Sequence, residues 1–176
     1  KKPPPILTSV EVATQSTVAR DEFAKTVTID SPLVLKEDRD IEVLGAFLRA
    51  VYPMMDPGSV SYVVYVTDGY ARRREDFTGS WKFLETAHDE DGNAQDVQVV
   101  SRNPTCHPGG CLLREDVVVS FDPQYLRTHR DRGLRFKIAG RAGEAVITIP
   151  PSYVAGFLDR LDRELAGSVP SPAATK

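Results

Sequence analysis

Side chains with distinctive chemistry are few in this sequence. Its 176 residues include two cysteines, three histidines, two methionines and one tryptophan. The charges nearly balance, with 22 Lys and Arg against 25 Asp and Glu, and this balance argues against a general nucleic-acid-binding protein. No apolar run approaches the roughly 20 residues that a membrane-spanning helix needs. Because 41% of the residues are hydrophobic, the composition also excludes global disorder, and we expect a folded globular domain.

Motifs of catalysis and cofactor binding are missing as well. The chain has no Gly-x-Ser-x-Gly nucleophile turn, no His-Glu-x-x-His metal motif, no glycine-rich phosphate loop and no dinucleotide fingerprint. No cofactor is therefore predicted, and a non-enzymatic protein is favoured. The alternative is a small hydrolase in which His88 acts together with acidic residues of the turn 89–96.

The two ends differ in composition from the rest of the chain. The opening sequence KKPPP favours a stiff, extended linker over residues 1–5. Residues 168–176, rich in Pro, Ala and Ser, predict a flexible tail. Between them we expect one globular domain over residues 6–167.

A Pro-Gly turn separates the first pair of predicted strands. Residues 41–52 have partly helical apolar spacing, but Pro57-Gly58 favours a tight reversal between two extended segments. We therefore interpret 44–52 and 60–67 as a β-hairpin.

Alternating hydrophobic patterns continue along the rest of the chain. Asp91-Gly92 predicts a hairpin turn, because glycine tolerates the positive φ that such a turn needs. A short crossover is expected at 124–132, and an apolar stripe predicts a helix from Pro151 or Ser152 to Gly167. The further expected strands are 81–86, 97–100, 115–121, 134–138 and 145–149. Together these patterns predict a mainly β (α+β) fold: an antiparallel sheet of six to seven strands in hairpins and meanders, with the C-terminal amphipathic helix packed on it.

Both cysteines lie in one short segment, CHPGGC at 106–111. Its glycines give the backbone the freedom that a small ring needs, so a disulfide between Cys106 and Cys111 is favoured. Such a bond is worth about 2 kcal/mol in the chain-entropy model and indicates a location outside the cytoplasm. Zinc bound by these cysteines and His107, with His88 or His129, is a second interpretation. Free or redox-active thiols are a third.

Four features together resemble uncharacterised bacterial envelope lipoprotein domains. They are the aromatic segment Trp81-Lys82-Phe83, the acidic Asp-Gly turn, the Cys106 to Cys111 segment and the strand Glu115–Val119, within residues 44–121. The resemblance implies a location on the periplasmic side of a membrane or at the cell surface, and no catalytic residues. Because the chain itself lacks the acylated cysteine of a lipoprotein, a lipid anchor would belong upstream of it.

One acidic turn is a candidate calcium-binding site. Asp89, Asp91, Asn93 and Asp96 place oxygen ligands at neighbouring positions, as Ca²⁺ sites do. The same residues are also what a solvated hairpin turn selects, and no Glu closes a full calcium loop. A solvated turn is therefore favoured over a metal site.

Basic residues gather in two segments and suggest an anionic partner. These are Arg72, Arg73 and Arg74, and further along Arg127, Arg130 and Arg132. The alternative is that they are ordinary surface charges, neutralised by acidic segments within the fold. We expect a non-enzymatic envelope module that binds a partner protein or an anionic envelope component; these arginines are the candidate contact residues.

Overall fold

A computed structural model gives the fold and describes residues 5–38, 42–72 and 81–168. The elements in chain order are α1 (Ser9–Gln15), β1 (Thr17–Asp21), β2 (Thr26–Asp30), β3 (Val34–Asp38), β4 (Glu42–Pro53), β5 (Ser61–Arg72), β6 (Leu84–Asp89), β7 (Ala94–His107), β8 (Gly110–Phe121), α2 (Pro123–Thr128), β9 (Leu134–Gly140), β10 (Gly143–Ile149) and α3 (Pro151–Ser168). The expected class, mainly β with a C-terminal helix, is confirmed.

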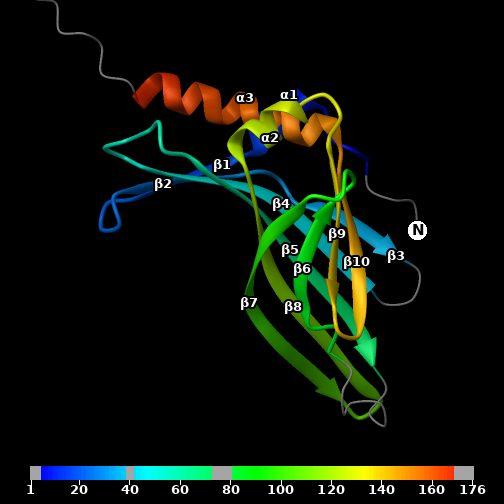
Figure 1. Ribbon diagram of the computed structural model, residues 1–176. Helices are drawn as coiled ribbons and strands as arrows, with labels where there is room; N and C mark the ends of the chain where they lie inside the picture. The colour runs from blue at the N-terminus through cyan, green and yellow to red at the C-terminus, as the bar shows by residue number, and fades with distance from the viewer. Residues whose placement is uncertain (1–4, 39–41, 73–80, 169–176) are drawn as a thin grey trace, which may run out of the picture.

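All ten strands belong to one antiparallel sheet (Figure 1). Nine of them follow the order β1-β2-β4-β5-β8-β7-β6-β9-β10, and β3 pairs with β4 beside β2. The expectation of six to seven strands was therefore wrong. The missed strands are the short β1, β2 and β3, which are five residues each and rich in threonine and charged side chains, so their hydrophobic alternation is weak.

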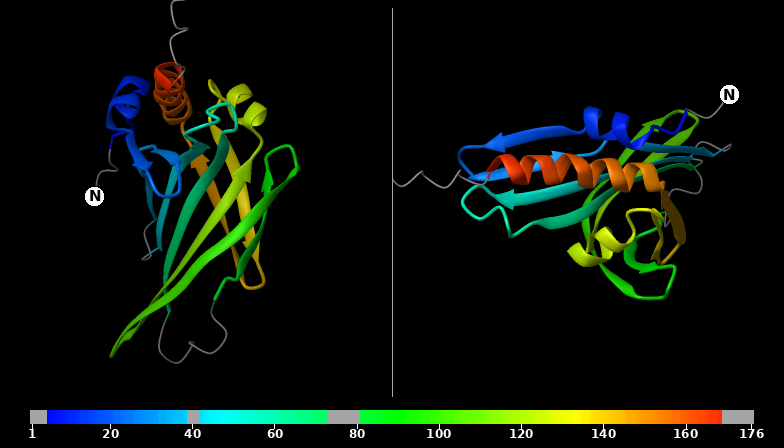
Figure 2. Two further views of the ribbon diagram at one scale, coloured as in Figure 1. Left: turned by 90° about the vertical axis from the view of Figure 1, so that its left-hand side faces the viewer. Right: turned by 90° about the horizontal axis from the view of Figure 1, so that it is seen from above.

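The helices cover one end of the sheet. Figure 2 shows α3 over one end of the sheet, with α1 beside it. The apolar stripe of α3 is fully buried there, through Val154, Phe157, Leu158 and Leu161. A Cβ atom at Gly156 would lie 2.3 Å from the carbonyl oxygen of Ser9, so glycine is what lets α1 approach α3 so closely. One hydrophobic core thus joins the helices to the inner face of the curved sheet.

Two predicted hairpins and the C-terminal helix are confirmed. β4 pairs with β5 through the interval predicted as 44–52 with 60–67, and β9 pairs with β10 around the turn at 140–143. The helix α3 extends one residue beyond its predicted end, into Ser168, which the sequence placed in the tail. Residues 1–4 of the predicted linker and 169–176 of the predicted tail lie outside the described residues.

The strand predicted at 81–86 is displaced. β6 begins only at Leu84, because Phe83 adopts a positive φ of 55° that interrupts the extended chain. Over the described residues, β6 pairs with β7 only at Ala87↔Gln95 and His88↔Ala94, and its main partner is β9. The turn at Asp91-Gly92 is present as predicted, with Gly92 at φ 85°.

The other end of the sheet extends beyond the helices as a long hairpin. β7 and β8 pair from Asp96↔Ser120 to His107↔Gly110, and β5 follows β8 on its other side as far as Arg72↔Cys111. We call residues 101–116, the distal part of this hairpin, the arm. Figures 1 and 2 show it projecting away from α3.

Candidate functional site

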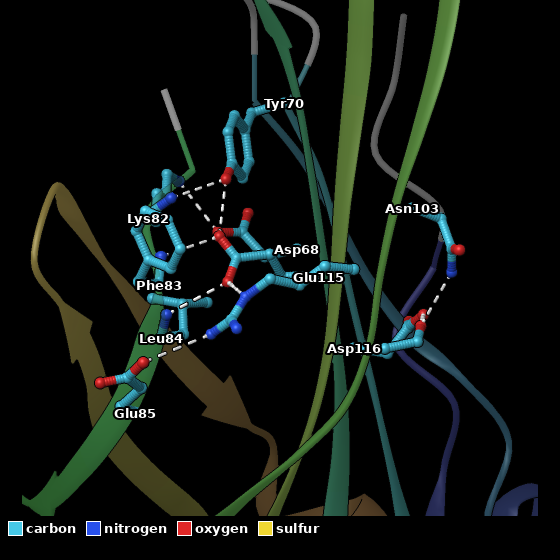
Figure 3. A network of polar contacts seen from close by, with 11 residues as sticks. Asp68, Tyr70, Lys82, Phe83, Leu84, Glu85, Asn103, Glu115 and Asp116 are labelled. Carbon is cyan, nitrogen blue, oxygen red and sulfur yellow. Dashed lines mark hydrogen bonds and ion pairs between the residues drawn. The ribbon is translucent and has the colours of Figure 1, made fainter. Parts of the chain in front are cut away.

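A buried carboxylate, that of Glu115, organises the base of the arm (Figure 3). The side chain is fully buried and accepts hydrogen bonds from the Tyr70 hydroxyl at 2.6 Å and from Arg102 Nε at 3.0 Å. It also accepts the backbone N–H groups of Phe83 at 3.1 Å and Leu84 at 3.2 Å. The carboxylate therefore satisfies two main-chain donors at the point where β6 begins and its pairing with β7 is missing.

The pKa of Glu115 reflects this environment. Burial raises it, but the hydrogen bonds from Tyr70, Arg102, Leu84 and Phe83 lower it by more, so the pKa lies below its ordinary value. The pKa of Tyr70 moves up, because burial and the hydrogen bond to Glu115 both disfavour the phenolate. Glu115 is thus held as an anion and Tyr70 as a neutral donor.

A second buried acid lies directly opposite the first. Asp68 on β5 pairs in register with Glu115 on β8, and both side chains face inward. Asp68 is bound by Lys82 Nζ at 2.9 Å, and that ammonium also lies 4.6 Å from the centre of the Tyr70 ring. Two neighbouring carboxylates are therefore neutralised by two different cations, Lys82 and Arg102, as buried charges require.

The chain is tightly constrained where it enters this network. The backbone N–H of Lys82 donates to the Tyr70 hydroxyl at 2.8 Å, and the Lys82 carbonyl accepts from Ala142 N at 3.1 Å. A Cβ atom at Gly140 would lie 2.1 Å from that carbonyl oxygen and 2.2 Å from the carbonyl oxygen of Phe83. These contacts hold Phe83 in its left-handed conformation, which is costly for a bulky residue.

The outer face of the same strands carries a smaller polar cluster. Asp116 accepts hydrogen bonds from Thr67 at 2.6 Å, Ser101 at 2.8 Å and Arg114 Nε at 3.0 Å. Burial raises the pKa of Asp116, but these bonds lower it by more. β5, β7 and β8 are therefore tied together on both faces of the sheet at the base of the arm.

At the tip of the arm, Cys106 and Cys111 form a disulfide. The two residues are directly paired across β7 and β8, next to the Pro108-Gly109 turn. The predicted disulfide is confirmed. The interpretations as a zinc site or as free thiols are excluded for these cysteines, because both sulfur atoms are consumed by the bond.

The strand β7 is the most open part of the arm. Its residues from Asn103 to His107 are exposed, and Val99 and Val100 at its base are exposed apolar side chains, as is Leu112 on β8. No described strand pairs with β7 on the side away from β8 beyond Gln95. Pro104, which has no N–H to donate, is compatible with such an edge position. The bulge between Val99 and Ser101 is typical of an edge strand.

His88 is not arranged as a catalytic base. It is exposed, whereas Asp89 beside it on β6 points inward and is buried. The imidazole lines a shallow depression of about 170 Å³ with Glu90, Arg135 and Lys137. Within the described ranges, no hydrogen bond or ion pair involves its ring. Among the residues that the structure describes, His88 therefore has no partner with which to form the catalytic pair of the hydrolase alternative.

The acidic turn is organised by Asp89 alone. Its carboxylate accepts the backbone N–H groups of Asp91 at 3.0 Å and Asn93 at 2.8 Å, and the side-chain amides of Asn93 at 3.0 Å and Gln95 at 3.3 Å. Burial raises the pKa of Asp89, but these bonds and one from Tyr125 lower it by more. Its oxygens thus hold the turn together, and Asp96 lies apart, on the strand β7 opposite Ser120. No group of three or more metal-ligating side chains occurs in the parts of the chain that the structure describes.

The arginines of the 127–132 segment have intramolecular partners. Arg127 binds Asp162 at 2.8 Å and Arg130 binds Asp159 at 2.6 Å, both on α3, while Arg132 lies 3.0 Å from Nε2 of the buried His129. Arg72 ends β5, and Arg73 and Arg74 lie outside the described residues. Arg127, which lies in α2, and Arg130 and Arg132, which follow it, are therefore engaged within the fold.

The buried network of Glu115 and Asp68 was not predicted, although the sequence contains a sign of it. Asp68 and Glu115 each fall on the inward face of an alternating strand, in phase with Val64 and Val66 and with Val117 and Val119. A charged residue in phase with core positions indicates a buried ion pair or a functional group. Its partners, Lys82 and Arg102, lie on other segments and could not be assigned from spacing.

Comparisons with protein families, with curated proteins and with solved structures found no match. The resemblance to bacterial envelope lipoprotein domains therefore stays a prediction. Among the described helices, none is long and apolar enough to cross a membrane.

Proposed function

We propose that this protein is a non-enzymatic module that works outside the cytoplasm and binds a partner protein through the arm. The observation that carries the proposal is the arm itself: an extended hairpin, closed by a disulfide, which projects from the helix-covered body and exposes β7. A preorganised surface loses little conformational entropy on binding, and this favours association.

The base of the arm supports the same role. The Glu115 and Asp68 network, with its four hydrogen bonds to Glu115, fixes the direction in which the hairpin leaves the body. Exposed Val99, Val100 and Leu112 offer apolar contacts, and Arg114 offers a charged one. Aliphatic side chains with a charged rim are typical of protein-binding surfaces.

A protein partner is favoured over an anionic envelope component. Arg127 and Arg130 are already paired with carboxylates of α3, so an anion would have to compete with an existing ion pair. The hydrolase alternative has no supporting geometry at His88. The extracytoplasmic location is supported by the disulfide, which reducing compartments disfavour.

A site-specific photo-crosslinker tests the binding role. Placed at Thr105 on the arm, it should give a discrete adduct in intact cells of the source organism. The matched control is Thr148, an exposed threonine of β10, which should give none. The adduct should weaken in the Val100→Ser/Leu112→Ser variant. Identical products at both positions, or no adduct at Thr105, would overturn the proposal.

Alkylation tests the location separately. A thiol reagent added to intact cells before lysis should label the cysteines only after reduction. Labelling without a reductant would show that the disulfide is open in the cell and that the protein works in a reducing compartment.

A further inference from the structure

Two neighbouring turns lie at the far end of β5 from the arm. The β1–β2 turn covers residues 22–25, and the β4–β5 connection covers residues 54–60. Met54 N donates to the Lys25 carbonyl at 2.8 Å, and Thr26 pairs with Pro53, so the two turns are side by side. All views place them at the same side of the molecule (Figures 1 and 2). We call them the turn pair.

Each turn presents one large apolar side chain to solvent. Phe23 is 101% exposed and Met55 is 90% exposed, the two highest values for large hydrophobic residues in the described part of the chain. Single exposed apolar residues are common on protein surfaces, but here two large and almost completely exposed ones lie on adjacent turns.

The turns are built to hold these side chains outward. Asp21 accepts the N–H groups of both Phe23 and Ala24 at 2.8 Å, and Lys25 adopts a positive φ of 55°. In the second turn, the Asp56 side chain binds the Ser59 hydroxyl, and Asp56 O accepts Ser59 N at 3.1 Å. The acidic residues are thus used in the turns themselves, and Glu22 is paired with Lys25 at 3.4 Å.

We propose that the turn pair inserts Phe23 and Met55 into the interface of a phospholipid bilayer. The two side chains project from convex turns and together present roughly 400 Å², about half of the 800 Å² per partner that a stable protein interface needs. A bilayer interface requires no matching pocket, and its affinity scales with the apolar area buried.

Local charge defines the kind of membrane. Glu22, Lys25 and Asp56 give the turn pair a formal charge of −1, and Asp21, the residue just before its first turn, adds a second negative charge. An anionic surface would be repelled rather than attracted. The inferred ligand is therefore a zwitterionic phospholipid surface, held by apolar contact, with the long side chains of Glu22 and Lys25 at headgroup level.

The turn pair and the arm lie at opposite ends of β5. β5 begins beside the turn pair and ends alongside the arm, and its 12 residues span about 40 Å. A molecule seated on a bilayer through the turn pair would direct the arm away from the lipid.

Vesicle sedimentation of the full chain tests this inference. With phosphatidylcholine vesicles at millimolar lipid, the Phe23→Ser/Met55→Ser variant should show about tenfold weaker partitioning than the parent. The matched control, Val100→Ser/Leu112→Ser, removes two exposed apolar side chains from the other end and should partition like the parent. Adding phosphatidylserine should not increase binding. An unbound parent chain, an unaffected turn-pair variant or binding that requires phosphatidylserine would overturn the inference.

A spectroscopic readout keeps the test independent of folding defects. In a Trp81→Phe background, Phe23→Trp should shift its emission to shorter wavelength with phosphatidylcholine vesicles and be quenched by brominated lipid. Val100→Trp in the same background should not respond. A silent Trp at position 23 would contradict insertion. The turn-pair variant should retain the adduct of the Thr105 crosslinker, so this inference and the proposed function can fail separately.

Discussion

The two halves of β8 are stabilised by different kinds of interaction. Its C-terminal half, with Val117, Val119 and Phe121, lies in the apolar core beneath the helices. Its N-terminal half lies in the arm, where the described apolar cluster is limited to Tyr70, Cys111, Leu113 and the adjoining Trp81. There a disulfide and charge-assisted hydrogen bonds stabilise the strands, in place of apolar packing against helices. Where the sheet extends beyond its covering helices, covalent and ionic contacts thus take the place of apolar packing in this protein.

The largest effect is expected from the helix-covered half. Phe157→Ala removes a fully buried aromatic ring of α3 and should lower the free energy of unfolding by about 3–5 kcal/mol, measured by urea denaturation. Arg163→Ala, on the exposed side of the same helix, is the control and should change little. A loss below 1 kcal/mol for Phe157→Ala would mean that α3 contributes little to the core.

The second-largest loss of stability is expected from a substitution at the base of the arm. Glu115→Gln keeps the size of the side chain but removes the charge that Arg102 and two backbone N–H groups require. We expect a loss of about 2–3 kcal/mol in unfolding free energy. Glu85→Gln, a half-exposed acid 3.7 Å from the same arginine, is the matched control and should cost far less.

The same variant predicts a change in pH dependence. The folded pKa of Glu115 is depressed, so its contribution is complete above the unfolded value near 4.5 and is lost as the pH falls through the folded pKa. Glu115→Gln should therefore flatten the stability profile below about pH 4.5, as measured by denaturation at a series of pH values. An unchanged acid slope would show that Glu115 does not govern it.

Opening the disulfide should have a smaller and more local effect. Cys106→Ser/Cys111→Ser should lower stability by about 2 kcal/mol, since the ring contains only six residues. Hydrogen exchange should accelerate in the arm and remain slow in α3 and the core part of β8. Uniform acceleration would place the arm and the body in one cooperative unit instead.

The smallest effect is expected at the surface ion pairs of α3. Arg130→Ala breaks the bond to Asp159, in which both side chains are more than a third exposed. Such pairs contribute about 0.2–1 kcal/mol and are screened by salt. Thermal denaturation at low and high salt should show the difference between parent and variant shrinking as the salt increases. A difference that persists at high salt would indicate a role in packing.

The sequence predicted the regular part of the fold well, for identifiable reasons. Strong alternation around Pro57-Gly58 and the 140–143 turn placed two hairpins, Asp91-Gly92 placed a turn, and the stripe from Val154 to Leu165 placed α3. The register of β6 was not predictable, because it depends on the left-handed conformation of Phe83. Tertiary contacts with Gly140 and Tyr70 set that conformation, and they leave no local pattern.

The candidate sites show the same difference between features set by local sequence and features set by tertiary packing. The disulfide follows from local spacing and was predicted, whereas the ion pairs of Arg127 and Arg130 depend on how α3 packs. The turn pair could not be predicted from the sequence either. Phe23 and Met55 are far apart in sequence, and only the pairing of β2 with β4 makes them neighbours.

The pairing of β5 with β8 has a mechanical consequence. The two strands are antiparallel and match at eleven positions, from Tyr62↔Phe121 to Arg72↔Cys111. Tension between a membrane at the start of β5 and a partner at the start of β8 would run along the strands, at right angles to their hydrogen bonds. All eleven positions would share that load in shear, and pulling on single molecules at these two ends would measure the force at which the pairing breaks.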